Sequence, residues 1–290
     1  METPLVSVLL ASYNHEAYIE ASVRSVMSQK GVSFELIVID DGSRDSSPEI
    51  LEKLAQELGF VYKHRENKGV MATLSELIDL AQGTFFCTFA SDDIMPMGRL
   101  KAQADYLTAH PKKIACFGQI VKMDKDGNRA LMPDPRYLRS IPEVSFEEFF
   151  LGKKELHGCT EMIRLEEFKA NGGYDQEFPF EDFPLWLSML EKYGSLPVLS
   201  TVCCYYREHG KNMSLDNTLM YGTFIRVLER YQSHPLYKKA LNIWKSHWFS
   251  VLAYSNPKEA LKRFPELASF SLPFFTRFLK LFIPSVFLKH

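Results

Sequence analysis

The feature that most constrains the fold is an apolar run of strand length that ends at two adjacent carboxylates. Residues 84–89 are rich in aromatic and apolar side chains, follow Gly83, and lead into Asp92 and Asp93. A run of this length bounded by a turn residue predicts a buried strand. Two carboxylates at its end repel each other and resist loss of solvent, and a divalent cation would relieve both costs. Taken alone, the pair has a simpler explanation, because Asp93 could cap a helix that starts near Met95.

The same pattern recurs through the first 95 residues. Apolar runs predict strands at residues 5–11, 34–39 and 60–64, and between them lie segments whose apolar residues recur on one helical face. Alternating strands and helices at this spacing predict right-handed βαβ units and a parallel sheet. The ligand site of such a sheet lies off the carboxyl ends of its strands.

Polar residues follow each of these predicted strands and would gather on one rim of the sheet. They are residues 12–14, Asp40 with Asp41, residues 67–69, and Asp92 with Asp93. Each segment alone is ordinary turn chemistry. Their coincidence on one rim indicates a nucleotide pocket, in which Tyr13 can stack on a base and Asp41 can accept a hydrogen bond from a base N–H. A Gly-x-Gly-x-x-Gly motif and a P-loop are both absent from the sequence, which counts against a dinucleotide-binding dehydrogenase and a P-loop enzyme.

Charge and cysteine content narrow the class of protein further. The formal net charge is -2, so nothing indicates bulk nucleic-acid binding. Five cysteines show no metal-ligand spacing, and we expect reduced residues in a cytosolic protein. The first apolar run is short and lacks a basic leader, and no run of about 18 uncharged apolar residues occurs, so neither a signal peptide nor a spanning helix is expected.

As an ordered set, four segments resemble the inverting glycosyltransferases of family 2, which have the GT-A fold. The segments are residues 6–14, 38–43, 67–69 and 91–93, and the resemblance covers roughly the first 210 residues. It implies an α/β, mostly parallel sheet flanked by helices, a nucleotide-sugar donor, expected to be a UDP-sugar, and Mn2+ or Mg2+ as cofactor.

The resemblance also assigns roles to residues on the rim. It implies that Ala11 and Tyr13 border the base, that Asp41 binds it, and that Lys68 joins the nucleotide-binding residues. Asp92 is expected to face the sugar or ribose of the donor. Asp93 is expected to ligate the metal.

A second acidic pair, Glu181 and Asp182, precedes a helical segment that contains Pro184. Asp182 is well placed to cap that helix. The resemblance implies a different role, in which Asp182 is the general base beneath the donor sugar. Inverting transfer needs one carboxylate there, because the acceptor hydroxyl loses its proton as it attacks the anomeric carbon. Glu181 is the alternative base.

Residues 205–214 resemble the family's segment that carries a Tyr-Arg pair, a His and an Asn-x-Ser sequence. Neutral imidazole can ligate a metal, so His209 is a candidate ligand, although a loop histidine is more often only solvated. Arg207 or Lys211 could meet the diphosphate. His157 ranks lower, as a residue facing the acceptor, and no role is assigned to His15 or His64.

The sequence predicts a catalytic domain at residues 1–213, with a nucleotide-binding half at 1–95 and an acceptor and catalytic half at 96–213. A helical extension follows at 214–290. Residues 270–290 hold six phenylalanines and only basic charges, which suits a helix at a membrane surface. The alternatives are that this tail packs on the preceding helices or forms a homodimer contact. We expect a peripheral protein at the cytoplasmic face of the membrane.

These observations predict a metal-dependent inverting glycosyltransferase. It would move a sugar from a nucleotide diphosphate to a hydroxyl of a glycan or lipid-linked acceptor in cell-surface polysaccharide synthesis. A sugar nucleotidyltransferase is a weaker alternative, because it would need a glycine-rich basic loop after the first strand. A catalytically silent scaffold of the same fold is a second alternative, and the intact Asp93 and Asp182 speak against it.

Overall fold

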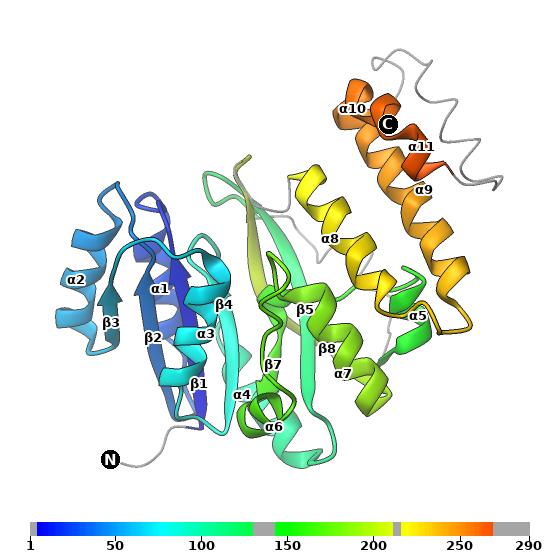
Figure 1. Cartoon of the computed structure of the whole chain (residues 1–290). Coiled ribbons are helices and arrows are strands. Elements are labelled where there is room, and N and C mark those ends of the chain that lie inside the picture. The colour runs from blue at the N-terminus through cyan, green and yellow to red at the C-terminus, as the bar shows by residue number, and fades with distance from the viewer. Residues whose placement is uncertain (1–4, 130–142, 211–215, 269–290) are drawn as a thin grey trace. The chain divides into compact units, whose positions relative to one another are not determined.

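The computed structural model describes residues 5–129, 143–210 and 216–268 (Figure 1). The chain forms two compact units. The first comprises the residues up to 146 together with residues 155–209, and the second comprises residues 147–154 together with the residues from 210 onward. Lys211 and the predicted membrane-surface segment at 270–290 lie outside the described residues.

The described part of the first unit contains a mixed sheet of eight strands. They are β1 (Val6–Ser12), β2 (Phe34–Asp40), β3 (Val61–His64), β4 (Phe85–Ala90), β5 (Ala115–Asp124), β6 (Glu143–Ser145), β7 (Met162–Arg164) and β8 (Ser195–Glu208). Their order across the sheet is β3-β2-β1-β4-β7-β5-β8-β6 (Figure 1). The first four strands in that order are parallel, as is the pair β5 and β8. Strand β7 is antiparallel to both neighbours, and β6 is antiparallel to β8.

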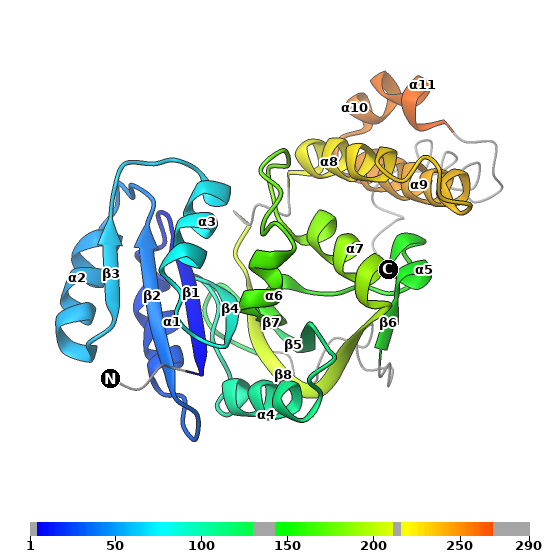
Figure 2. The same ribbon diagram turned by 60° about the horizontal axis from the view of Figure 1, so that its bottom comes forward.

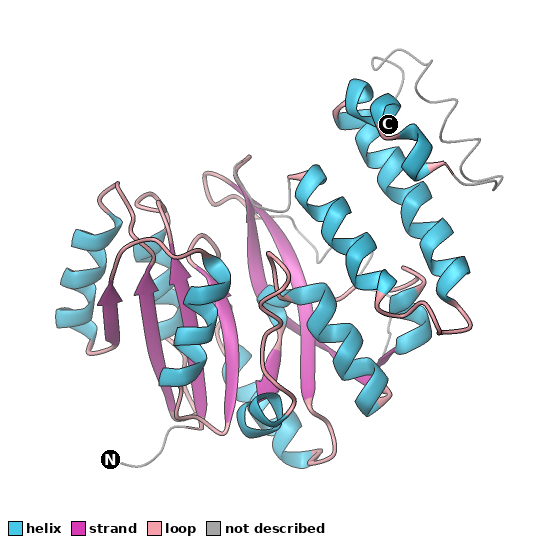
Figure 3. Cartoon of the chain, in the orientation of Figure 1, coloured by secondary structure: helices cyan, strands magenta, loops and turns pink. Residues whose placement is uncertain are grey.

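Helices of the first unit flank this sheet (Figure 3). They are α1 (Ile19–Met27), α2 (Ser47–Leu58), α3 (Val70–Leu80), α4 (Arg99–Ala109), the 3-10 helix η1 (Gly158–Thr160), α6 (Leu165–Ala170) and α7 (Asp182–Tyr193), while α5 (Phe146–Phe150) spans the boundary between the units. Val6, Val8 and Leu10 of β1 pack into one core with α1, α2 and α4. Helix α3 contacts β1 and β2 on the opposite side of the sheet from α1 (Figure 1), and α4 runs beside β8 (Figure 2). The predicted α/β fold with a mostly parallel sheet is confirmed.

Three polar residues that precede or begin helices do not cap them. Asn14 lies before α1, whose N-cap is Tyr18, and its side chain accepts the N–H of Arg44 instead, at 2.8 Å. Helix α4 starts only at Arg99 after Gly98, so Asp93 is not its cap. Asp182 is the first residue of α7, and the N-cap position is held by Glu181, which makes no side-chain capping hydrogen bond. The carboxylates of Asp93 and Asp182 can therefore contact groups other than the N–H groups at a helix start.

The second unit is helical in its described part. It contains α8 (Asn217–Glu229), α9 (Tyr237–Ser255), α10 (Pro257–Lys262) and α11 (Phe264–Leu267). Its core includes Trp248, Phe249 and Leu252 of α9. Trp244 donates its indole N–H to the carbonyl of Phe150 at 2.9 Å, which ties residues 147–154 to this unit. None of the described helices combines the length and apolar character needed to cross a bilayer.

Candidate active site

The strand register brings the predicted rim residues to one edge of the sheet. Ser12 of β1 pairs with Asp40 of β2, and Ala11 pairs with Ala90 of β4. The N–H of Asp41 also donates to the carbonyl of Ser12 at 2.8 Å. The turns that follow β1, β2 and β4 therefore meet at one end of the parallel strands, where such sheets bind ligands.

Asp41 is buried and holds the turn after β3. Its carboxylate accepts the backbone N–H groups of Lys68 and Gly69, at 2.8 and 2.9 Å, and forms an ion pair with Arg65. The predicted nucleotide residue Lys68 thus contributes its main chain here, and its side chain is exposed. Tyr13, predicted to border the base, is 45% exposed at this edge. Asp41 accordingly positions a strand-end loop, and the base-binding role stays a prediction.

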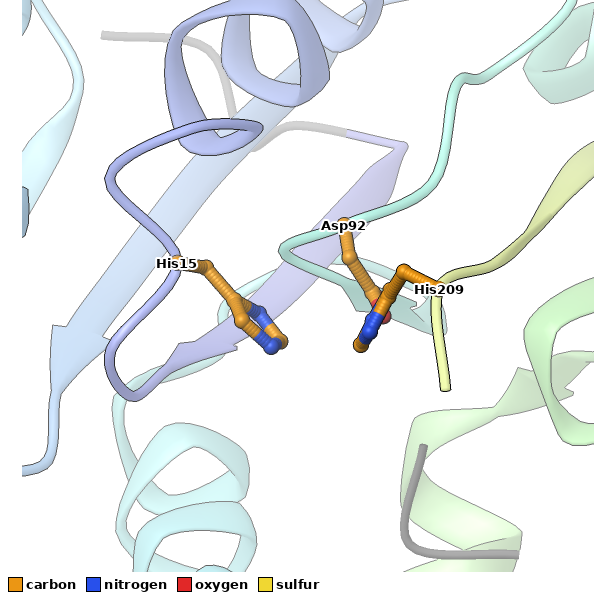
Figure 4. Close-up of side chains that lie close together, drawn as sticks. All are labelled: His15, Asp92 and His209. Carbon is orange, nitrogen blue, oxygen red and sulfur yellow. The ribbon is translucent and has the colours of Figure 1, made fainter. Parts of the chain in front are cut away.

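The side chains of His15, Asp92 and His209 lie together on the same rim (Figure 4). They come from the loops after β1, β4 and β8, and their potential ligand atoms all lie within 4.8 Å of one another. His209 Nε2 is 2.7 Å from Asp92 Oδ2, and His15 Nδ1 is 2.6 Å from Ser91 Oγ. Two imidazoles and a carboxylate are donor groups that bind divalent transition ions. The donor set therefore fits a metal ion.

Asp93 faces away from this cluster into the protein. It is 1% exposed, and its carboxylate accepts the N–H of Arg207 at 2.8 Å and the thiol of Cys204 at 3.2 Å. Burial, followed by the charge of Asp92, raises the pKa of Asp93 to about 7. The sequence interpretation paired Asp93 with His209 as metal ligands. In the structure His209 meets Asp92, so the geometry favours Asp92 as the carboxylate partner of His209.

Arg207 secures the turn that carries Asp92. Its Nε donates to the carbonyl of Asp92 at 2.7 Å, and Nη1 donates to that of Lys125 at 3.2 Å. The guanidinium also lies 4.7 Å from the ring centroid of Tyr18, and that ring stacks on His209. These contacts make Arg207 a residue that positions Asp92 and His209. Its predicted contact with the nucleotide stays a prediction.

Glu181 and Asp182 form a half-buried acidic pair where α7 begins. Asp182 Oδ1 has no exposure to solvent and no hydrogen-bond partner among the described residues. Burial raises the pKa of Asp182 well above its ordinary value, and the charges of Glu181 and Glu161 add to the effect. Burial also raises the pKa of Glu181, opposed by a hydrogen bond from Asp182. A carboxylate with a raised pKa is a stronger base, which is what proton abstraction from a hydroxyl requires.

Glu161 lies near this pair and is fully buried. It accepts hydrogen bonds from Thr88 Oγ1 at 3.0 Å and from Trp186 Nε1 at 3.1 Å. Burial is the main reason that its pKa rises to about 7. Because Trp186 lies one turn after Asp182 on α7, this bond fixes the helix that presents Asp182.

Cys159 connects the two acidic regions. Its thiol lies with Asp93 and Cys204 in a second group whose ligand atoms are within 4.8 Å of one another. It also contributes to the raised pKa of Asp182. Asp182 also packs on Gly158, the residue before Cys159, since a Cβ added to Gly158 would lie 2.5 Å from Asp182 Oδ1. Asp93 and Asp182 therefore lie in the same region of the first unit, and each is close to Cys159.

The sequence interpretation missed several of these residues. His15 was given no role, although it follows Asn14 directly at a predicted strand end and could have been included by the same rim argument. Arg65, Glu161 and the two thiols carry no motif. Their partners come from distant segments, and only the folded chain brings them together.

Solved structures share this fold. The crystal structure of S. aureus TarS 1–349 in complex with UDP-GlcNAc matches with a TM-score of 0.65 at 19% identity, covering 95% of this chain and 79% of that one. The mannosyltransferase PcManGT from Pyrobaculum calidifontis, in complex with GDP-Man and Mn2+, matches with a TM-score of 0.62 at 16% identity, covering 100% and 89%. At such identities the likeness shows the fold alone, which is of the predicted GT-A type.

Relatives are also found by sequence. A putative teichuronic acid biosynthesis glycosyltransferase of Bacillus subtilis, TuaG, is 28% identical over 192 residues, 65% of this chain and 73% of the relative. An uncharacterized glycosyltransferase of Rickettsia typhi is 27% identical over 192 residues, which cover 65% of this chain. The match spans 59% of the length of that protein, and 31% of a relative from Rickettsia conorii.

The family comparison covers most of the sheet. A family model described as glycosyl transferase family 2 matches residues 7–171, which is more than half of the 290 residues. The matched region contains the rim of β1, β2 and β4 together with Glu161. The chain belongs to glycosyl transferase family 2.

Proposed function

We propose that this protein is an inverting glycosyltransferase that moves a sugar from a UDP-sugar to a hydroxyl of a cell-surface glycan or a lipid-linked acceptor. The observation that carries the proposal is the acidic pair of Glu181 and Asp182, in which Asp182 Oδ1 is buried and the pKa of Asp182 is raised. This acidic pair lies in the same unit as Asp92 and His209, whose side chains offer metal-ligand atoms.

A nucleotide-sugar donor is supported by the family and by the ligands of similar structures. TarS was solved with UDP-GlcNAc and PcManGT with GDP-Man and Mn2+. In this chain we assign the base to the edge formed by Ala11, Tyr13 and Asp41, with Lys68 at its border. The name of TuaG refers to teichuronic acid biosynthesis, which supports a surface polysaccharide as the acceptor class.

We assign a divalent ion, Mn2+ or Mg2+, to Asp92 and His209. When bound, such an ion neutralises the charge that develops on the departing diphosphate. Asp92 and His209 would hold the ion, and Arg207 holds the turn of Asp92 through the bond to its carbonyl. Asp93 fixes the adjoining strand by accepting the N–H of Arg207.

The transfer itself is a single displacement. The acceptor oxygen forms a bond to the anomeric carbon as the bond from that carbon to the diphosphate oxygen breaks. Asp182 takes the proton of the hydroxyl, and attack from the face opposite the diphosphate inverts the anomeric centre. Glu161 keeps α7 in place through Trp186.

The proposal is tested by incubating the full chain with UDP-, GDP- and dTDP-sugars, with Mn2+ or with a chelator, and measuring release of the nucleoside diphosphate. We expect release from a UDP-sugar that depends on Mn2+ and is lost in Asp182→Asn. Absence of release from every donor, or full release by Asp182→Asn, would overturn the proposal.

A lipid-linked acceptor would also give a role to the membrane-surface segment predicted at residues 270–290. Co-sedimentation with liposomes tests that role, comparing the full chain with a form that ends at residue 269. Equal binding by both forms would exclude it.

A further inference from the structure

We propose that His15 is a third protein ligand of the metal site. The site would then hold its ion with two imidazoles and one carboxylate, and would favour a late transition ion such as Co2+ over Mg2+. This inference rests on the proposed function only in taking Asp92 and His209 as the other two ligands. Its test measures binding of the ion and does not need sugar transfer.

The first support is distance. Ligands about 2.1 Å from a shared ion lie about 3 Å apart when adjacent and about 4.2 Å apart when opposite. His209 Nε2 and Asp92 Oδ2 are 2.7 Å apart, and all three side chains offer ligand atoms within 4.8 Å of one another. The three groups therefore need only small movements to reach one ion. Figure 4 shows the imidazoles of His15 and His209 pointing toward each other.

The second support is the hydrogen bond of His15. Its Nδ1 is 2.6 Å from Ser91 Oγ. Metal-bound histidines usually donate the N–H of one ring nitrogen to an oxygen and bind the ion through the other. With Nδ1 engaged by Ser91, the nitrogen that would bind the ion is Nε2. Ser91 directly precedes Asp92, so the same turn supplies one ligand and orients another.

The third support is the rigidity of the loop that carries His15. The N–H of His15 donates to Ser47 Oγ at 3.1 Å, and the N–H of Asn14 donates to Ser43 Oγ at 2.8 Å. Asn14 has a φ of 53°, a left-handed conformation that Asn adopts more readily than most residues. The segment that runs from β2 into α2 thus holds this loop, and His15 is presented to the site before an ion arrives.

The chemistry of the ligands sets the expected selectivity. Mg2+ prefers oxygen ligands and loses its water reluctantly. Imidazole suits the later first-row ions, and affinity rises from Mn2+ to Co2+ at nitrogen-containing sites. Removing one imidazole should therefore weaken Co2+ binding much more than Mg2+ binding.

The experiment titrates the full chain with Co2+ and with Mg2+, by calorimetry and by the visible absorption of bound Co2+, each with and without UDP. We expect His15→Ala to weaken Co2+ binding by more than the about tenfold to hundredfold that loss of an outer-shell partner costs, to change the Co2+ spectrum, and to leave Mg2+ binding within about twofold. Ser91→Ala should weaken Co2+ binding by a smaller factor, because it removes only the partner of Nδ1.

His110→Ala is the matched control. His110 follows α4, is exposed, and bonds through Nδ1 to the carbonyl of Tyr106, so this variant should bind Co2+ like the natural protein. Equal Co2+ affinity and spectrum in His15→Ala and the natural protein would overturn the inference, as would equal losses for Co2+ and Mg2+. A protein that binds Co2+ through His15 but transfers no sugar would support the inference while contradicting the proposed function.

Discussion

Trp186 on α7 donates its indole N–H to the buried carboxyl of Glu161, with 3.1 Å between Nε1 and Oε2. The second oxygen of Glu161 accepts the hydroxyl of Thr88 on β4. One carboxyl group therefore joins the helix of the proposed base to the strand that leads to the metal site. Because Glu161 is fully buried, its protonation affects both the stability of the fold and the field around Asp182.

Glu161→Gln should change how stability depends on pH. The pKa of Glu161 is raised from 4.5 to about 7 in the folded protein, so its favourable contribution is fully present below about pH 4.5 and is lost as the pH rises through about 7. The full shift corresponds to about 3 kcal/mol. Urea unfolding at pH 5 and pH 8 should show the natural protein losing stability relative to Glu161→Gln at the higher pH. Glu166→Gln, at an exposed position, should follow the natural protein, and an unchanged difference between the two pH values would contradict the prediction.

Asp182→Asn should abolish transfer and spare donor binding. The amide cannot accept the hydroxyl proton, and loss of a general base typically costs about 10²–10⁴ in rate. Calorimetric titration with a UDP-sugar measures binding, and product formation measures transfer. Glu191→Gln, an exposed change on the same helix, serves as the control. Normal turnover by Asp182→Asn would remove it from the mechanism.

Transfer by the natural protein should increase with pH. The raised pKa values of Asp182 and Glu181 mean that the pair loses its last proton at a higher pH than isolated carboxyls, and only the unprotonated form accepts the hydroxyl proton. Initial rates at saturating donor are measured across the neutral range. A rate that falls steadily with rising pH would argue against a carboxylate base.

Gly158→Ala should impair transfer with little effect on metal binding. Its Cβ would lie 2.5 Å from Asp182 Oδ1, so the carboxylate must shift, and a displaced base loses rate steeply. Gly222→Ala is a matched control, because nothing lies within 4 Å of the added Cβ. Comparable activity of the two variants would show that the position of Asp182 is not critical.

Asp92 and Asp93 should give opposite results when each is changed to Ala. Asp93→Ala leaves the buried N–H of Arg207 without its acceptor, and such a loss costs about 1–3 kcal/mol of stability. Asp92→Ala should cost less stability and remove Mn2+ binding. Thermal unfolding and Mn2+ titration of both variants separate the two roles. Loss of Mn2+ binding in a stable Asp93→Ala protein would restore the assignment made from sequence.

The difference between these two neighbours shows what sequence could and could not establish. The apolar runs and turn residues predict β1 to β4, and the parallel arrangement follows from their alternation with helices. The grouping of strand ends on one rim follows in turn. Asp92 and Asp93, however, lie in the turn after β4, where Asp92 contacts His209 and Asp93 contacts Cys204. Which of them contacts His209 depends on the turn after Ala90, and the periodicity does not specify that turn.

Later parts of the sheet were less predictable for a related reason. The short β7 pairs antiparallel with β4 and β5, and a strand of three residues has little periodicity to detect. Cys159 and Thr160, which come shortly before β7, belong to η1. The structural role of Glu161 depends on its hydrogen bonds with Thr88 and Trp186, which are 73 and 25 residues away in sequence.

The second unit includes residues 147–154 as well as the C-terminal helices. The ring of Phe150 packs on Tyr231 and His234, and its carbonyl accepts the indole N–H of Trp244. No single cut in the polypeptide can therefore excise an intact sheet-bearing part, because removing the C-terminal helices would strip the partners from a segment embedded in the middle of the chain. Any chimera that exchanges the C-terminal helices has to exchange residues 147–154 with them.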